Sequence, residues 1–119
     1  MTTLIEQLQA RLLALNPAGG VHYGINPTEP AVYPYIVWQR VISSANAVLQ
    51  GPTDLQNTRV QIDIYSRRIS EAVPLVSALE ELMRTWAVQN VPISSVDLFE
   101  DTLRVFRVTK DYSIWSSNG

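Results

Sequence analysis

The 119-residue chain contains no cysteine and only one histidine. Without cysteine it can form no disulfide, no cysteine-ligated zinc or iron–sulfur site, and no thiol nucleophile. The single histidine, His22, would need carboxylate partners to hold zinc, and no acidic residue stands at a recognisable spacing from it. We therefore expect no metal site and no cofactor. A loop histidine beside Tyr23 is the ordinary interpretation of His22.

The chain also has little excess charge and no long hydrophobic run. Nine basic and eleven acidic residues give a net charge of −2, which does not provide the broad basic face of a general nucleic-acid binder. No segment approaches the roughly 20 apolar residues of a membrane-spanning helix. Glu6 and Arg11 interrupt the N-terminal segment, which is therefore unlike a signal peptide. We expect a protein of the cytoplasm, unless it leaves as part of a larger particle.

The N-terminal segment has the pattern of an amphipathic helix. Thr3 followed by Glu6 fits a capping box, and Asn16-Pro17 ends the pattern because proline disfavours helical geometry in the residue before it. The helix would bury apolar residues at steps of three and four: Ile5, Leu8, Leu12 and Leu15.

Glycine and proline then dominate residues 18–34, which predicts a long loop. Within it, "VHYGI" could form a short edge strand. Tyr23, Tyr33 and Tyr35 in and beside this loop are amphipathic anchors that suit an interface, although tyrosines at a strand entrance also serve to cover the edge of a core.

Two strands follow, over residues 35–43 and 59–66. The first carries apolar groups on both faces, which favours a central position in a sheet. In the second, Val60, Ile62 and Ile64 alternate with polar residues, the pattern of a sheet with one packed and one polar face. The connection, residues 44–57, is long for a hairpin and should project from the sheet.

A second helix is predicted after Ser70, a plausible N-cap, with Pro74 just past its first turn. One stripe of this helix should face the core: Ala72, Leu75, Val76, Leu79, Leu82, Met83 and Trp86.

Two further strands are expected over residues 93–101 and 103–115, turning near residues 100–102. Their alternation places Val96, Leu98, Phe106 and Val108 on packed faces, with Arg104, Arg107 and Lys110 partly among the exposed positions. Residues 113–119 should fray. The whole chain, residues 1–119, thus reads as one α+β domain, an antiparallel sheet of about four strands with two helices packed on one face, in the order α-β-β-α-β-β.

No catalytic constellation emerges from these elements. The adjacent carboxylates at Glu80-Glu81 and Glu100-Asp101 diverge on a helix and on a strand, so neither pair converges on a substrate. Arg67-Arg68, where a strand ends and a helix begins, could meet an anion, but solvation of a helix entry is the simpler interpretation. The residues therefore favour binding or assembly over catalysis.

Four sequence features together resemble a known family: "YPYIVWQRV", the loop "QGPTDLQ", the strand "RVQIDIYS", and the helix "SEAVPLVSALEELM". Over residues 4–112 the chain resembles the tail-completion proteins of long-tailed bacteriophages and prophages, which are related to tail-terminator and tail-to-head joining proteins. The resemblance implies a structural protein without catalytic residues. It would be a subunit of a homo-oligomeric, hexameric ring at the head-proximal end of the tail tube, in the neck of the virion, assembled in the host cytoplasm.

The ring implied by this resemblance would contact the major tail tube protein and the head connector, and genome DNA would pass through its lumen without specific binding. The positions expected at its interfaces are Tyr23, Tyr33, Tyr35, Leu49, Gln50, Asp54, Leu55, Arg67 and Arg68. The positions expected at its lumen or rim are Asp54, Asp63, Glu100 and Asp101.

Three other functions are compatible with the same sequence. A head-closure or neck adaptor subunit is a close alternative. A small-ligand binder would use the loop around His22 with Tyr23 and Tyr33. A nucleic-acid module would use a basic set, and its binding would weaken steeply with salt: Arg67, Arg68, Arg104, Arg107 and Lys110.

Overall fold

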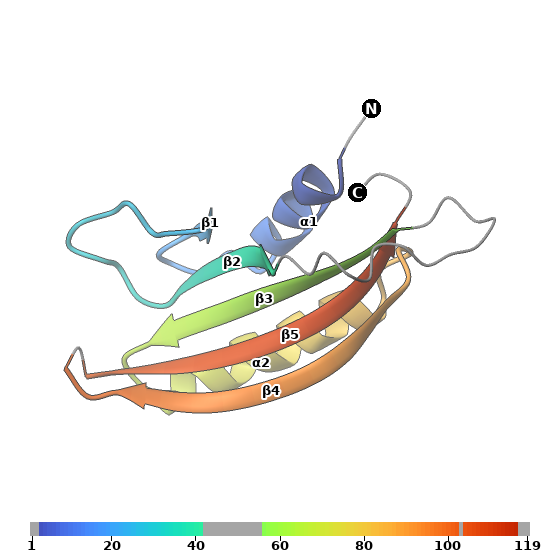
Figure 1. Ribbon diagram of the computed structural model, residues 1–119. Coiled ribbons are helices and arrows are strands. Elements are labelled where there is room, and N and C mark those ends of the chain that lie inside the picture. Colours follow the sequence, from blue (N-terminus) through green and yellow to red (C-terminus); the bar gives the residue numbers. More distant parts are fainter. Residues whose placement is uncertain (1–2, 42–55, 103, 117–119) are drawn as a thin grey trace.

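The computed structural model describes residues 3–41, 56–102 and 104–116, which form two helices and one five-stranded sheet (Figure 1). In chain order the elements are α1 (Leu4–Leu13), β1 (Val21–Tyr23), β2 (Tyr35–Val41), β3 (Gln56–Ser66), α2 (Ile69–Arg84), β4 (Asn90–Glu100) and β5 (Val105–Ser116).

The predicted α+β class is confirmed, and the sheet has one strand more than the four that were expected. The spatial order is β1-β2-β3-β5-β4, and every pair is antiparallel except β1 with β2. The extra strand is the "VHY" of the glycine-rich loop, in which Val21 pairs with Ile36. Because β1 runs parallel to β2, the chain between them returns to the start of β2, and β1 and β4 become the two edges of the sheet.

Both helices lie on the same face of the sheet, where a single core forms (Figure 1). The alternation predicted for β3 is confirmed, because Val60, Ile62 and Ile64 are buried against the helices. In β2, which carries apolar groups on both faces, the buried face is that of Ile36 and Trp38. Helix α1 begins with the predicted capping box, since the Thr3 hydroxyl accepts from the Glu6 N–H while the Glu6 carboxylate accepts from the Thr3 N–H. The buried stripe of α1 comprises Leu4, Leu8 and Leu12.

Helix α2 begins earlier than Ser70 suggested. Arg68, in an extended conformation and without a side-chain cap, occupies the N-cap position, and Pro74 lies inside the helix. The Ser66 hydroxyl donates instead to the Arg68 carbonyl, which steadies the turn from β3. The core stripe of α2 is otherwise as predicted, with Ala72, Leu79 and Met83 buried and Leu75, Val76, Leu82 and Trp86 packed partly against the core.

Three expectations about the last two strands were wrong. Val96 and Leu98 are 47% and 42% exposed, because they lie beside Thr109 and Arg107 on the face opposite the helices, where no described element covers β4. Lys110 is buried, because it lies on the helix-covered face of β5. Residues 113–116 are not frayed, since β5 continues to Ser116 and pairs with the start of β3. Val108 is buried as predicted.

Gly19 anchors the long loop to the start of β2. Its N–H donates to the Pro34 carbonyl at 2.8 Å. A Cβ at this position would lie 1.8 Å from the Val32 carbonyl oxygen and 2.8 Å from the Cβ of Tyr35. Only glycine fits this approach of two backbone segments without displacement.

Candidate assembly surfaces

An aromatic–arginine cluster, Tyr33, Tyr35, Tyr65 and Arg67, lies on the sheet face opposite the helices, where β2 begins and β3 ends. The ring of Tyr35 stacks on that of Tyr65 at 4.8 Å and touches that of Tyr33 at 5.4 Å. The Arg67 guanidinium lies 4.7 Å above the Tyr33 ring, a cation–π distance. Burial, and then the neighbouring Tyr33, raises the pKa of Tyr35 to about 12, so its hydroxyl stays protonated at neutral pH.

Ion pairs occupy the middle of the same face. Arg107 Nη2 lies 3.1 Å from Asp63 Oδ2, and Arg107 Nη1 lies 3.4 Å from Glu100 Oε1. Arg59 Nη2 lies 3.6 Å from Asp111 Oδ2, further along the same two strands. Opposite charges thus alternate across neighbouring strands, and this face carries no strong field of one sign.

Several polar atoms of this face are buried without a partner among the residues that the structure describes. They are Arg59 Nε, Arg107 Nε, Thr109 Oγ1 and Asp111 Oδ1. Buried polar groups in native proteins are nearly always hydrogen-bonded, to protein or to water. The face opposite the helices is therefore incompletely satisfied by the described part of one subunit.

The β4 edge is the longest uncovered strand edge of the described residues. Within these residues no strand pairs with the side of β4 that faces away from β5. Unpaired edges of this kind template pairing with another chain, and natural proteins usually blunt or cover them. Here blunting is confined to one end, where Pro92 and a bulge between Pro92 and Ser94 interrupt the ladder. The β4 edge patch consists of five side chains that are 42–47% exposed, Val91, Ile93, Val96, Leu98 and Phe99.

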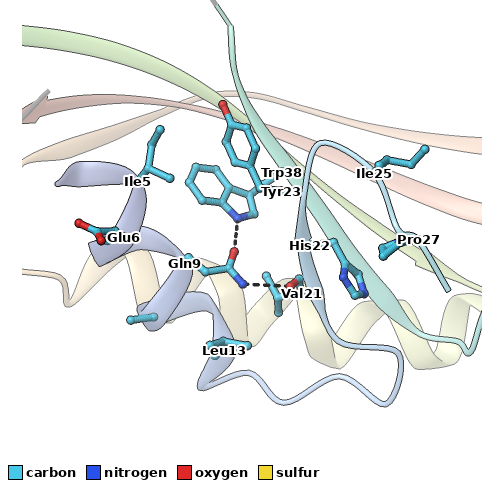
Figure 2. Close-up of a pocket in the computed structure, with 11 residues that line it drawn as sticks. Ile5, Glu6, Gln9, Leu13, Val21, His22, Tyr23, Ile25, Pro27 and Trp38 are labelled. Atoms are coloured by element: carbon cyan, nitrogen blue, oxygen red, sulfur yellow. Dashed lines mark hydrogen bonds between the residues drawn. The ribbon is translucent and has the colours of Figure 1, made fainter. Parts of the chain in front are cut away.

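A groove of about 570 Å³ lies at the opposite edge of the sheet, between α1, β1 and the chain that follows β1 (Figure 2). Gln9 forms its floor. The Gln9 Oε1 accepts from the Trp38 indole N–H at 2.7 Å, and its Nε2 donates to the Val21 carbonyl at 3.0 Å. One side chain thus links α1, β1 and β2 beside the groove.

The walls of this α1–β1 groove are apolar and exposed. Leu13 is 52% exposed, Tyr23 45% and Ile25 74%. The Tyr23 ring meets the Trp38 ring edge-on at 4.8 Å, which fixes its orientation. His22 also lines the groove, but one of its ring nitrogens, Nε2, lies 2.8 Å from the Gly19 carbonyl and is engaged within the loop. The groove presents an apolar surface rather than a set of reactive groups.

A second cavity, of about 510 Å³, lies between the end of α2 and strands β4 and β5. The buried Lys110 ammonium lies 2.6 Å from Glu80 Oε2 beside it. Burial, and then the nearby Glu80 carboxylate, raises the pKa of Tyr112 to about 12. Lys110 and Glu80 pair with each other, which favours a structural role for this cluster over catalysis.

The residues expected at interfaces fall in two places. Tyr33, Tyr35 and Arg67 form the aromatic–arginine cluster, whereas Tyr23 lines the α1–β1 groove at another edge. Arg68 is exposed at the start of α2. The remaining expected interface positions, Leu49, Gln50, Asp54 and Leu55, lie outside the described residues.

The residues expected at a lumen or rim are also separated. Asp63 is buried and forms an ion pair with Arg107, which also pairs with Glu100. Asp101 is exposed in the turn between β4 and β5. Asp54 lies outside the described residues. The sequence pattern does not reveal the β4 edge patch, because alternation in β4 predicts a packed face. The available signal was Pro92, because proline within a strand is confined largely to sheet edges and bulges.

The basic residues do not form one face. Lys110 is buried on the helix side with Glu80, while Arg107 is engaged by acidic partners on the opposite side. Among the described residues there is also no group of three His, Cys, Asp or Glu side chains placed to hold a metal ion. No helix in the described ranges is long and apolar enough to cross a membrane.

Comparison with known proteins places this fold in a family. A solved structure shares 15% sequence identity with the chain at a TM-score of 0.50, covering 90% of this chain and 86% of that one, which indicates a common fold. No curated protein matches the chain. The family model described as "Tail completion protein gp17" matches residues 5–117, nearly the entire sequence. The chain therefore belongs to the tail completion protein gp17 family, a family of structural components of the phage virion.

Proposed function

We propose that this protein is the tail terminator of a long-tailed phage or prophage. In this role it forms a ring, most simply a hexamer, at the head-proximal end of the tail tube, stops tube growth, and joins the tail to the head connector. The observation that carries the proposal is the match to the tail completion family over residues 5–117. Its partners are the major tail tube protein, the connector proteins and further copies of itself.

The surfaces of the subunit support an assembly role. Cyclic rings use heterologous contacts, in which one patch of each subunit meets a different patch of its neighbour. This subunit has two apolar surfaces at opposite edges of one sheet, the β4 edge patch and the α1–β1 groove. The aromatic–arginine cluster offers a third surface, of the composition that protein interfaces favour.

A ring through which DNA passes should not bind phosphates tightly, because each neutralised phosphate adds a favourable and salt-dependent contribution to affinity. The net charge of −2 and the pairing of Arg107 with Asp63 and Glu100 are consistent with that requirement. We place Glu100 and Asp101, in and beside the β4–β5 turn, at the rim of the ring or its lumen. Asp63 contributes there by neutralising Arg107.

Electron microscopy of particles made without this protein tests the proposal. A phage or prophage deleted for the gene should produce tubes that are abnormally long and lack heads, and supplying the wild-type gene in trans should restore the normal length. Tails of normal length beside heads that leak DNA would instead identify a head-closure protein. Normal infectious particles would refute both roles.

A further inference from the structure

We propose that the ring closes by docking the β4 edge patch of one subunit into the α1–β1 groove of the next. This inference rests on the proposed ring function and names the two surfaces that meet. The occupant of the groove is thus a second copy of this chain.

The positions of the two surfaces allow such a contact to repeat. The strand order places β1 and β4 at opposite edges of the sheet, with three strands between them. Figure 1 shows α1 beside β1 at one edge and β4 at the other. A contact that joins opposite sides of identical subunits leaves one free donor and one free acceptor surface at every step, and it ends only when the ring closes.

The two surfaces are also matched in chemistry. Within the described residues, the β4 edge presents unpaired backbone groups flanked by Val96, Leu98 and Phe99. The groove presents Leu13, Tyr23 and Ile25 around a volume of about 570 Å³. A head-to-tail contact between copies of this chain covers both apolar surfaces at once. If the partners were other proteins, each of the two surfaces would need a partner of its own.

The areas are those that a stable contact needs. With about 150–200 Å² for each complete side chain, the exposed fractions leave on the order of 400 Å² on the β4 edge patch and somewhat less in the groove. A standard interface buries about 800 Å² on each partner, a little over half of it apolar. Each surface therefore supplies most of the apolar area that one side of such an interface requires.

Charge substitutions on the exposed side chains test the contact without disturbing the fold. Leu98→Asp and Ile25→Asp should each prevent assembly, so that light scattering gives the mass of one chain, 13.3 kDa. Val73→Asp is the matched control, because Val73 is 55% exposed on α2 and belongs to neither surface, and this variant should assemble like the wild type. Circular dichroism should be unchanged in all three variants. The thermal midpoint should be unchanged only in Val73→Asp, because the two variants that lose the subunit contact also lose its contribution to stability.

Cross-linking then determines which surfaces meet, and the cysteine-free chain makes the experiment clean. Purified Leu98→Cys and Ile25→Cys proteins, mixed and treated with a short bis-maleimide, should give a covalent dimer, and the double variant should give a ladder that ends at the ring. Each single variant alone should give no dimer. Ser77→Cys, exposed on α2, is the control and should not cross-link to either.

The outcomes separate the contact from the ring itself. A dimer from Leu98→Cys alone would show that two β4 edges pair with each other and would overturn the proposal. Rings that form normally with Leu98→Asp and Ile25→Asp would also overturn it, while leaving the terminator function intact. A wild-type chain that stays monomeric in solution and on purified tails, where the same cross-linking is repeated, would refute both the contact and the ring.

Discussion

The buried pair of Lys110 and Glu80 makes a sharp test of how charge is held in this core. The Lys110 side chain is only 6% exposed, whereas Glu80, 2.6 Å away, is 53% exposed. Removing one partner of a fully buried pair costs about 3–5 kcal/mol, and a solvent-exposed pair contributes roughly 0–1 kcal/mol. Because only the ammonium is buried, we expect Glu80→Ala to lower the free energy of unfolding by about 2 kcal/mol.

Removing the buried charge itself should be far less costly. Lys110→Met replaces the ammonium by an apolar group of similar length, so its cost should be at most about 1 kcal/mol. The double variant, which lacks both charges, should recover most of the stability lost in Glu80→Ala. Glu81→Ala is the matched control, because Glu81 is 61% exposed and pairs with Arg84 on the surface; it should cause no measurable change.

Urea denaturation followed by circular dichroism measures these differences. A loss of 2 kcal/mol corresponds to a midpoint about 1 M lower in urea for a domain of this size. Equal midpoints for Glu80→Ala and Glu81→Ala would show that water in the adjacent cavity solvates the ammonium as well as the carboxylate does. That result would refute the argument that burial makes the pair asymmetric.

Three further predictions concern the groove, the loop and the pH dependence. Gln9→Leu leaves the Trp38 indole N–H without its acceptor, so calorimetry should show stability lower by about 1–3 kcal/mol. Gly19→Ala forces a Cβ against the Val32 carbonyl and should lower the free energy of unfolding by at least about 1–3 kcal/mol. Gly24→Ala is the control, because no atom lies within 4 Å of the added Cβ and its only cost is the strain of a φ of 87°. Because the pKa of Tyr112 is raised to about 12 in the folded state, the folded protein binds more protons than the unfolded one above pH 10. Stability should therefore fall by roughly 2 kcal/mol between about pH 10 and 12 in urea titrations, and Tyr112→Phe should abolish that part of the fall.

Much of the secondary structure followed from local patterns. The capping box at Thr3 and the apolar spacing that follows predicted α1, and alternation predicted the buried face of β3. These predictions succeeded because a helix repeats every 3.6 residues and a strand every two, so a short window already contains the whole signal. The family resemblance added the assembly role, which no single residue indicates.

Partners distant in sequence could not be predicted in this way. Alternation in β4 shows that Val96 and Leu98 share a face, but not that nothing packs on it. Lys110 looked like a surface lysine, and only its position opposite Glu80, thirty residues away, accounts for its burial. Gln9 gave no sign in the sequence of joining Trp38 to Val21.

By itself, the sequence determined the class of the fold, the helices, the inward face of β3 and the absence of cysteine chemistry, because each of these depends on composition or on neighbours along the chain. Only the tertiary structure decided which strands became edges. Strand β5 inserts between β3 and β4, so the outer side of β4 has no partner strand among the described residues, while β1 forms the opposite edge beside α1. Strand order depends on how the whole chain packs, and it created the two apolar edges to which we assign the ring contact.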